Sequence, residues 1–107
     1  MRPDVQSVLK ELRATLERLY GPRLQDLVLF GSYARGQERE GSDLDVAMIL
    51  DDFDRPWSEI ERTGPEVSRL SLQYGLTISL IPVRAKDWAG RDSPLLLALR
   101  AEGVPVP

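Results

Sequence analysis

Residues 27–50 read LVLFGSYARGQEREGSDLDVAMIL, in which two apolar runs flank a polar segment rich in glycine. The first run, residues 27–30, combines β-branched and aromatic side chains and ends at Gly31, as is typical of a buried strand. The second run, residues 44–50, is too apolar for an exposed edge and predicts a central strand covered on both faces. Together with helical patterns elsewhere in the chain, the two runs predict an α/β (α+β) fold with a small mixed β-sheet of three or more strands.

The turn after the first strand is suited to an anion. Gly31 has no Cβ, so a ligand can approach its backbone closely, and Ser32 adds a hydroxyl and an N–H group. If residues 32–35 form a helical turn, their free N–H groups point into the loop. A phosphate is the natural acceptor for these groups.

Two carboxylates stand at the start of the second strand. Because side chains alternate along a strand, Asp43 and Asp45 are expected to point to the same side. Two close carboxylates repel each other unless one takes a proton or a cation lies between them. The pair suits one Mg²⁺ with a nucleotide, or two ions that it bridges. An isolated Asp-x-Asp is most often a solvated strand end, but its combination with Gly31-Ser32 indicates metal-dependent phosphoryl or nucleotidyl transfer.

The motif also resembles a known signature. Gly31-Ser32-Tyr33-Ala34-Arg35-Gly36, followed by Ser42-Asp43-Leu44-Asp45-Val46, is similar to that of the DNA polymerase beta superfamily of nucleotidyltransferases. The short chain is most similar to the minimal nucleotidyltransferase branch. The resemblance implies a polymerase-beta-like fold, with ATP bound through Mg²⁺ and with Asp43 and Asp45 as catalytic residues and metal ligands. It implies Ser32 and the Gly31 backbone on the β and γ phosphates, with Arg35 and Ser42 also at the nucleotide.

Three residues of this loop have structural interpretations as well. Arg35 could hold a triphosphate oxygen, but we favour an interaction that ties the loop to Asp43 or to a nearby carbonyl group. Ser42 is expected to hold the loop by hydrogen bonding to backbone. For Tyr33 we favour packing over contact with a base or a partner.

The composition predicts a small domain and excludes several chemistries. In 107 residues there is room for one core, so we expect a single domain over residues 1–107. The sequence has no His and no Cys, which excludes a Ser-His-Asp triad, a thiol nucleophile, disulfides and Cys/His zinc sites. A net charge of −3 with scattered basic residues argues against direct binding of nucleic acid. Without a long apolar run or a signal peptide, the expected location is cytoplasmic.

Hydrophobic periodicity predicts the order helix, strand, strand, helix, strand, helix. Asp4 can cap a first helix, which Gly21-Pro22 ends. Its core positions are expected at Val5, Val8, Leu9, Leu12, Leu16 and Leu19.

The second half of the chain predicts two further helices and a strand between them. Pro56 suits the start of a helix with Ile60, Val67, Leu70 and Tyr74 on one face. An interior Pro costs roughly 3 kcal/mol, so Gly64-Pro65 predicts two helical pieces or a kink. Residues 76–83 predict a third strand ended by Pro82, and Ser93-Pro94 begins a last helix that runs to Gly103.

The third strand departs from the family pattern. The resemblance implies a third carboxylate here, which faces the Asp pair, helps to bind the catalytic metal and deprotonates the attacking hydroxyl. The matching position is Thr77 or Ser79, and neither hydroxyl can serve as a base at neutral pH. Because loss of a general base typically costs ~10²–10⁴-fold in rate, transfer could persist slowly.

Other acidic residues could take the place of the third carboxylate. Glu38 and Glu40 in the loop are the better placed candidates, although loop glutamates are usually solvated. Asp51, Asp52 and Asp54 follow the far end of the second strand, where we expect a polar turn with helix-capping roles.

The resemblance also implies a partner. The chain has segments for a triphosphate but little room for an acceptor, so a second chain is expected to supply it, compatible with a homo- or hetero-oligomer. The minimal branch implies a helical HEPN-type partner, often a ribonuclease toxin, with the nucleotidyltransferase as its antitoxin. The apolar last helix, with Leu95, Leu96, Leu97 and Leu99, is compatible with such an interface, although we favour core packing.

Two hypotheses therefore stay open. The chain is either an enzyme that adenylylates a hydroxyl on a partner protein, or a nucleotide-binding or purely interacting antitoxin that has lost efficient transfer.

Overall fold

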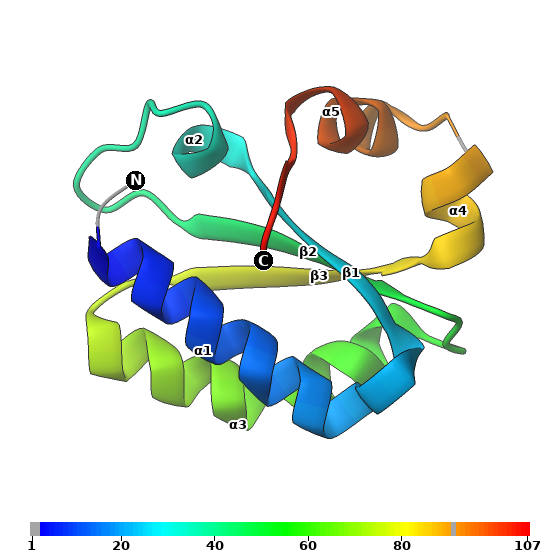
Figure 1. Cartoon of the computed structure of the whole chain (residues 1–107), viewed down its shortest axis with the longest axis horizontal. Helices are drawn as coiled ribbons and strands as arrows, with labels where there is room; N and C mark the ends of the chain where they lie inside the picture. Colours follow the sequence, from blue (N-terminus) through cyan, green and yellow to red (C-terminus); the bar gives the residue numbers. More distant parts are fainter. Residues whose placement is uncertain (1–2, 91) are drawn as a thin grey trace.

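A four-stranded mixed sheet separates two unequal layers of helices in the computed structural model, which describes residues 3–90 and 92–107 (Figure 1). The strands are β1 Leu24–Phe30, β2 Leu44–Leu50, β3 Ile78–Arg84 and β4 Val104–Pro105, in the order β3-β2-β1-β4. β1 is antiparallel to β2 and β4, whereas β2 and β3 are parallel. The predicted α/β class with a small mixed sheet flanked by helices is confirmed.

The larger layer consists of α1 (Pro3–Tyr20) and α3 (Pro56–Tyr74), which cover one face of the sheet (Figure 1). Apolar residues of α1 recur every three or four positions and therefore share one face, which packs on the even-numbered side chains of β2. Val5, Val8, Leu12 and Leu16 are at most 1% exposed. Gly21 follows α1 with a positive φ of 55° and opens a short 3-10 helix, η1 (Gly21–Arg23), so the helix ends where predicted.

Two details of α1 were predicted wrongly. Leu19 is 41% exposed, because Tyr20, four residues after Leu16, is the side chain that turns inward. Asp4 lies within the first turn of α1 and not before it, so the predicted cap is wrong.

A buried polar contact joins the ends of α1 and α3. The Tyr20 hydroxyl donates to Glu59 Oε1 over 2.9 Å, and Arg62 Nη1 lies 3.9 Å from the same oxygen. Tyr20 and Glu59 are each 4% exposed. Burial first, and then the hydrogen bond to Glu59, raise the pKa of Tyr20 to about 12.

α3 is one helix that contains Pro65, so the predicted two helical pieces are not found. Gly64 has no Cβ to clash with the Pro65 ring, and Glu61, whose carbonyl loses the Pro65 donor, is exposed to solvent. Leu70 is buried and Val67 and Tyr74 pack beside it, as predicted, but Ile60 is 38% exposed. The inward positions near it are held by Glu59 and Thr63 instead.

The smaller layer covers the opposite face with α4 (Ala85–Gly90) and α5 (Pro94–Glu102), and only α5 was predicted. The Ser93 side chain accepts from the Leu96 N–H over 3.2 Å, which confirms the predicted start of α5. Leu96 and Leu99 are buried, whereas Leu95 and Leu97 are 48% and 50% exposed, so core packing explains only half of the leucines. Within the described ranges, no helix is both long and apolar enough to cross a membrane.

β3 begins two residues later than predicted and continues through Pro82 to Arg84. The Leu44 N–H donates to the Thr77 carbonyl over 2.8 Å, which fixes the alternation along β3. Odd-numbered residues of β3 direct their backbone groups to β2, and even-numbered residues, Pro82 included, direct theirs to the outer edge of the sheet. Because no ladder bond is lost there, Pro82 does not end the strand.

A polar turn follows β2 at the far end of the sheet, as predicted. Asp51 Oδ1 accepts from the Asp52 N–H over 2.7 Å and from Arg23 Nε over 3.0 Å. The capping role is wrong, because the residue before α3 is Arg55 and no side chain caps this helix.

Candidate functional site

The two motif carboxylates lie where β2 meets the end of β1. Phe30 pairs with Asp45 in the β1–β2 register, so Gly31 follows directly beside Asp45. Leu44 and Val46 are fully buried against α1 and α3, and alternation therefore turns Asp43 and Asp45 toward the α5 side of the sheet. Asp45 is half-buried and Asp43 is exposed.

The electrostatics of the pair favour a bound cation. Burial raises the pKa of Asp45, the negative charge of Asp43 raises it further, and the Arg35 guanidinium partly offsets both. A divalent cation between the carboxylates would remove this repulsion. Two carboxylates suit one Mg²⁺ that completes its shell with phosphate and water oxygens, so the donor set fits the predicted metal.

Glycine is required at position 31 for two reasons, the backbone conformation and the lack of space beside Asp45. Its φ of 75° lies in the left-handed region, and a β-carbon at this position would overlap Asp45 Oδ2 and lie 3.2 Å from Asp45 Cγ. The helical turn that follows is α2 (Gly31–Ala34), which begins one residue earlier than predicted and includes Ser32. Gly31 and Ser32 are both half-buried, and Gly31 lies against Asp45.

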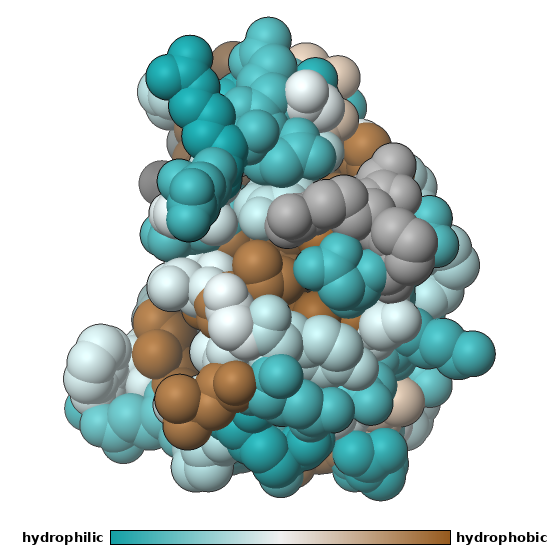
Figure 2. All heavy atoms as spheres, turned by 90° about the vertical axis from the view of Figure 1, so that its left-hand side faces the viewer, coloured by the Kyte–Doolittle hydropathy of each residue, from teal (hydrophilic) through white to brown (hydrophobic). Residues whose placement is uncertain are grey.

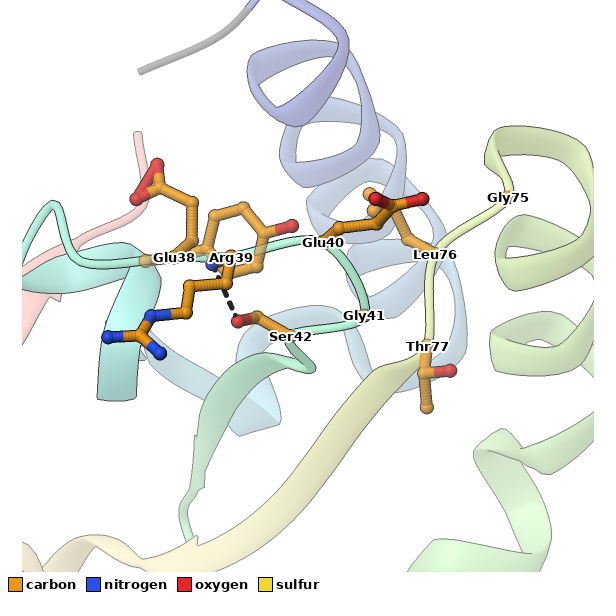
Figure 3. A pocket seen from close by; sticks show the side chains of 9 residues that line it. Glu38, Arg39, Glu40, Gly41, Ser42, Gly75, Leu76 and Thr77 are labelled. Atoms are coloured by element: carbon orange, nitrogen blue, oxygen red, sulfur yellow. Dashed lines mark hydrogen bonds between the residues drawn. The ribbon is translucent and has the colours of Figure 1, made fainter.

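The loop between the motif halves is held as the sequence predicted. Ser42 Oγ accepts from the Arg39 N–H over 2.8 Å, and the Ser42 N–H donates to the Arg39 carbonyl over 2.9 Å (Figure 3). Tyr33 is 6% exposed and belongs to the core under α1, which confirms that it packs.

Arg35 has different partners from those predicted. Its Nε donates to Gln37 Oε1 over 3.2 Å and its Nη1 to Glu102 Oε2 over 3.1 Å, so the tie to Asp43 or to a carbonyl is wrong. Glu102 ends α5, 67 residues away along the chain. No local pattern could indicate this contact, because it depends on how α5 packs on the sheet.

The two candidates on the third strand are not equivalent. Ser79 pairs in register with Asp45 on the neighbouring parallel strand, so the two side chains share one face of the sheet. Thr77 precedes β3 and its carbonyl accepts from Leu44. Across residues 3–90 and 92–107, no group of three or more acidic side chains could hold a metal ion, so neither Glu38 nor Glu40 joins the Asp pair in such a group.

A hollow of about 470 Å³ lies beside the site, at the end of the molecule that Figure 2 shows, where hydrophilic residues surround a few hydrophobic ones. Residues 38–42 form one wall and residues 75–77 the other (Figure 3), and Tyr33 also lines the hollow. Ser42, Glu38, Glu40 and Thr77 line it, whereas Asp43 and Asp45 do not. Gly41 and Gly75, both with positive φ, turn the chain at its rim and are the sequence signal that could have indicated it.

Comparisons with known proteins agree with this arrangement. The family model of the nucleotidyltransferase domain matches residues 9–94. Two proteins of Methanocaldococcus jannaschii, both named as candidate protein adenylyltransferases, are 32% and 35% identical to the chain. The first alignment covers 73% of this chain and 78% of its relative, and the second covers 71% and 70%.

Solved structures share the fold. A toxin–antitoxin complex with AMP-PNP contains a chain with a TM-score of 0.65 and 20% identity, over 99% of this chain and 73% of that one. The complex of a tri-AMPylated Shewanella oneidensis HEPN toxin with its MNT antitoxin gives a TM-score of 0.56 at 20% identity, over 95% and 71% of the two chains.

Proposed function

This chain belongs to the nucleotidyltransferase domain family, and from that membership we propose that it binds ATP with Mg²⁺ and transfers the adenylyl group to a hydroxyl on a partner protein. The observation that carries the proposal is the pairing of Asp43 with the half-buried Asp45 directly beside Gly31. The naming of the two M. jannaschii relatives as candidate protein adenylyltransferases supports the choice of a protein acceptor.

Each motif residue has one role in this proposal. Asp43 and Asp45 hold Mg²⁺, which when bound neutralises charge on the triphosphate. The backbone of Gly31 and the hydroxyl of Ser32 contact the β and γ phosphates. Arg35 adds positive charge to the site, and Ser42 fixes the loop that brings Asp43 to Asp45.

The reaction is a displacement at the α-phosphorus. The acceptor oxygen forms a bond to the α-phosphorus, the bond between this atom and the oxygen that bridges to the β-phosphorus breaks, and pyrophosphate leaves with the electron pair. The acceptor proton passes to solvent, because Ser79, the residue paired with Asp45, cannot take it at neutral pH. The chain therefore relies on charge stabilisation and alignment, and we expect slow transfer.

We further propose a HEPN-type protein as the partner and an antitoxin role for this chain. The proposal is supported by the shared fold with chains of toxin–antitoxin complexes, one of them with an AMPylated HEPN toxin. The exposed Leu95 and Leu97 on α5 are available for such a contact.

A second function is favoured by one observation, which is that Ser79, the residue paired with Asp45, carries a hydroxyl and not a carboxylate. In this alternative the chain binds ATP and its partner but does not transfer efficiently.

Incubation with ATP labelled at the α-phosphate, Mg²⁺ and the co-expressed neighbouring gene product would test the proposal. We expect label on the partner that is lost in Asp43→Asn and retained in Asp54→Asn, a matched change at the far end of β2. If the chain binds Mg–ATP and the partner tightly but transfers no label, adenylyl transfer is excluded and the second function, binding without transfer, is supported.

A further inference from the structure

The end of α5 reaches the motif loop through one ion pair. Glu102 Oε2 lies 3.1 Å from Arg35 Nη1, and Figure 1 shows α5 and α2 on the same side of the sheet. The position of Glu102 is fixed by the fold on both sides. Leu99, three residues earlier on α5, is buried, and β4, which follows Gly103, pairs with β1 at Val28 and Leu29. The contact is therefore set by packing and not by a mobile tail.

The negative charge of the Glu102 carboxylate lies at an unfavourable position in the helix. It is the last residue of α5, and the C-terminal end of a helix carries partial negative charge that repels an anion. Arg100 in the last turn of α5 offsets part of this helix-end charge, and Arg35 is the cation that pairs with the Glu102 carboxylate itself. The same Arg35 guanidinium partly offsets the rise in the pKa of Asp45 that burial and Asp43 cause, so it acts on both α5 and the carboxylate site.

We propose that Glu102 is a positioning residue of the nucleotide site, which holds Arg35 in the nucleotide-free protein and gives it up to a triphosphate oxygen. This inference rests on the proposed binding of ATP. A carboxylate and a phosphate present similar oxygen acceptors to a guanidinium, so a phosphate can take the place of the carboxylate on Arg35.

The exposure of the pair makes the exchange feasible. The side chains of Arg35 and Glu102 are 43% and 44% exposed, and ion pairs in such surroundings are weak. A triphosphate carries several negative charges and therefore competes well for the guanidinium. Glu102 lowers the affinity for ATP in two ways, because it occupies Arg35 and because it adds a negative charge near an anionic ligand.

Calorimetric titration of Mg–ATP into the full chain would test the exchange. We expect Glu102→Gln to lower the Kd about two- to fivefold, the size set by a weak exposed pair, and the gain to shrink in high salt. Glu66→Gln is the matched control, since Glu66 pairs with Arg69 at 3.0 Å and is 40% exposed on α3, across the sheet from α5. This control should leave the Kd unchanged.

An Arg35→Gln background separates positioning from a general charge effect. There, Glu102→Gln should improve the Kd by much less, because the carboxylate no longer competes for a guanidinium. Thermal unfolding of each variant establishes that it is folded. If the parent chain binds Mg–ATP and Glu102→Gln leaves the Kd unchanged or raises it, the role of Glu102 is refuted while ATP binding stands. If the parent chain does not bind Mg–ATP, both proposals fail.

Discussion

The carboxylate of Asp45 occupies the space in which a side chain at Gly31 would begin, since a β-carbon there would overlap Oδ2. The turn that we propose to bind phosphate and the strand that we propose to hold the metal therefore meet at these two residues. This relationship makes position 31 sensitive for two separable reasons, backbone conformation and the placement of Asp45.

Gly31→Ala should disrupt the site more than the backbone alone explains. Gly36 has a similar φ of 69° but open space around its Cα, so Gly36→Ala measures the cost of the left-handed conformation, roughly 1–2 kcal/mol. We expect both variants to lose about that much unfolding free energy in urea. Only Gly31→Ala should also lose about 10²-fold in transfer rate, because it displaces Asp45. Equal transfer rates for the two variants would show that a side chain at position 31 does not displace Asp45.

Ser79→Asp should raise the rate of transfer. Ser79 pairs with Asp45 on the same face of the sheet, so an aspartate there would return a general base to the site, worth up to ~10²–10⁴-fold. Thr77→Asp, placed before β3, is the control and should have a smaller effect. The measurement is the initial rate of label transfer to the partner at saturating ATP.

Asp45→Asn should stabilise the metal-free protein at neutral pH. Because folding raises the pKa of Asp45 above its ordinary value of 3.8, the contribution of this group to stability is present at low pH and is lost as the pH rises through the raised pKa. At neutral pH the charged form opposes folding, and asparagine removes this cost. The midpoint of thermal unfolding in EDTA should therefore increase.

The same variant should lose the stabilisation that we expect Mg–ATP to give the parent chain. A ligand at 100 times its Kd adds about 2.7 kcal/mol to the parent chain, and we expect little or none of this in Asp45→Asn. A variant that is less stable than its parent in EDTA would show that the charge does not oppose folding.

The Tyr20–Glu59 contact predicts a loss of stability in alkaline solution. The unfolded chain releases the Tyr20 proton near pH 10, whereas the folded chain holds it to about 12, so stability falls as the pH rises between these values. Two pKa units correspond to about 2–3 kcal/mol. Tyr20→Phe should remove this part of the pH dependence, measured as unfolding free energy in urea from pH 9 to 12. It should also cost about 1–3 kcal/mol at pH 7, because Glu59 loses a buried donor.

The sequence correctly predicted the structural elements that depend on patterns of neighbouring residues. The strands around the motif, the long α1 and the Ser93 cap follow from periodicity and from the preferences of single residues. The Ser42 bonds were predicted for the same reason, since they span three residues.

The features that the sequence did not predict correctly depend on contacts between segments that are distant along the chain. Pro82 stays in a strand because β3 is at the edge of the sheet, and Ile60 is exposed because Tyr20 draws Glu59 inward. The Glu102 partner of Arg35 requires knowledge of how α5 packs. For the third carboxylate, the sequence left Thr77 and Ser79 as equals, and only the β2–β3 register pairs Ser79 with Asp45.

Pro82 has a consequence for the behaviour of the protein at high concentration. An edge strand with free N–H groups is a template on which a second molecule can add a strand, which is a common route to aggregation. In β3 the proline stands at a position that faces outward, so it removes one donor from the middle of that edge. A Pro82→Val variant would restore the donor in an apolar strand, and its solubility limit should fall below that of the parent chain.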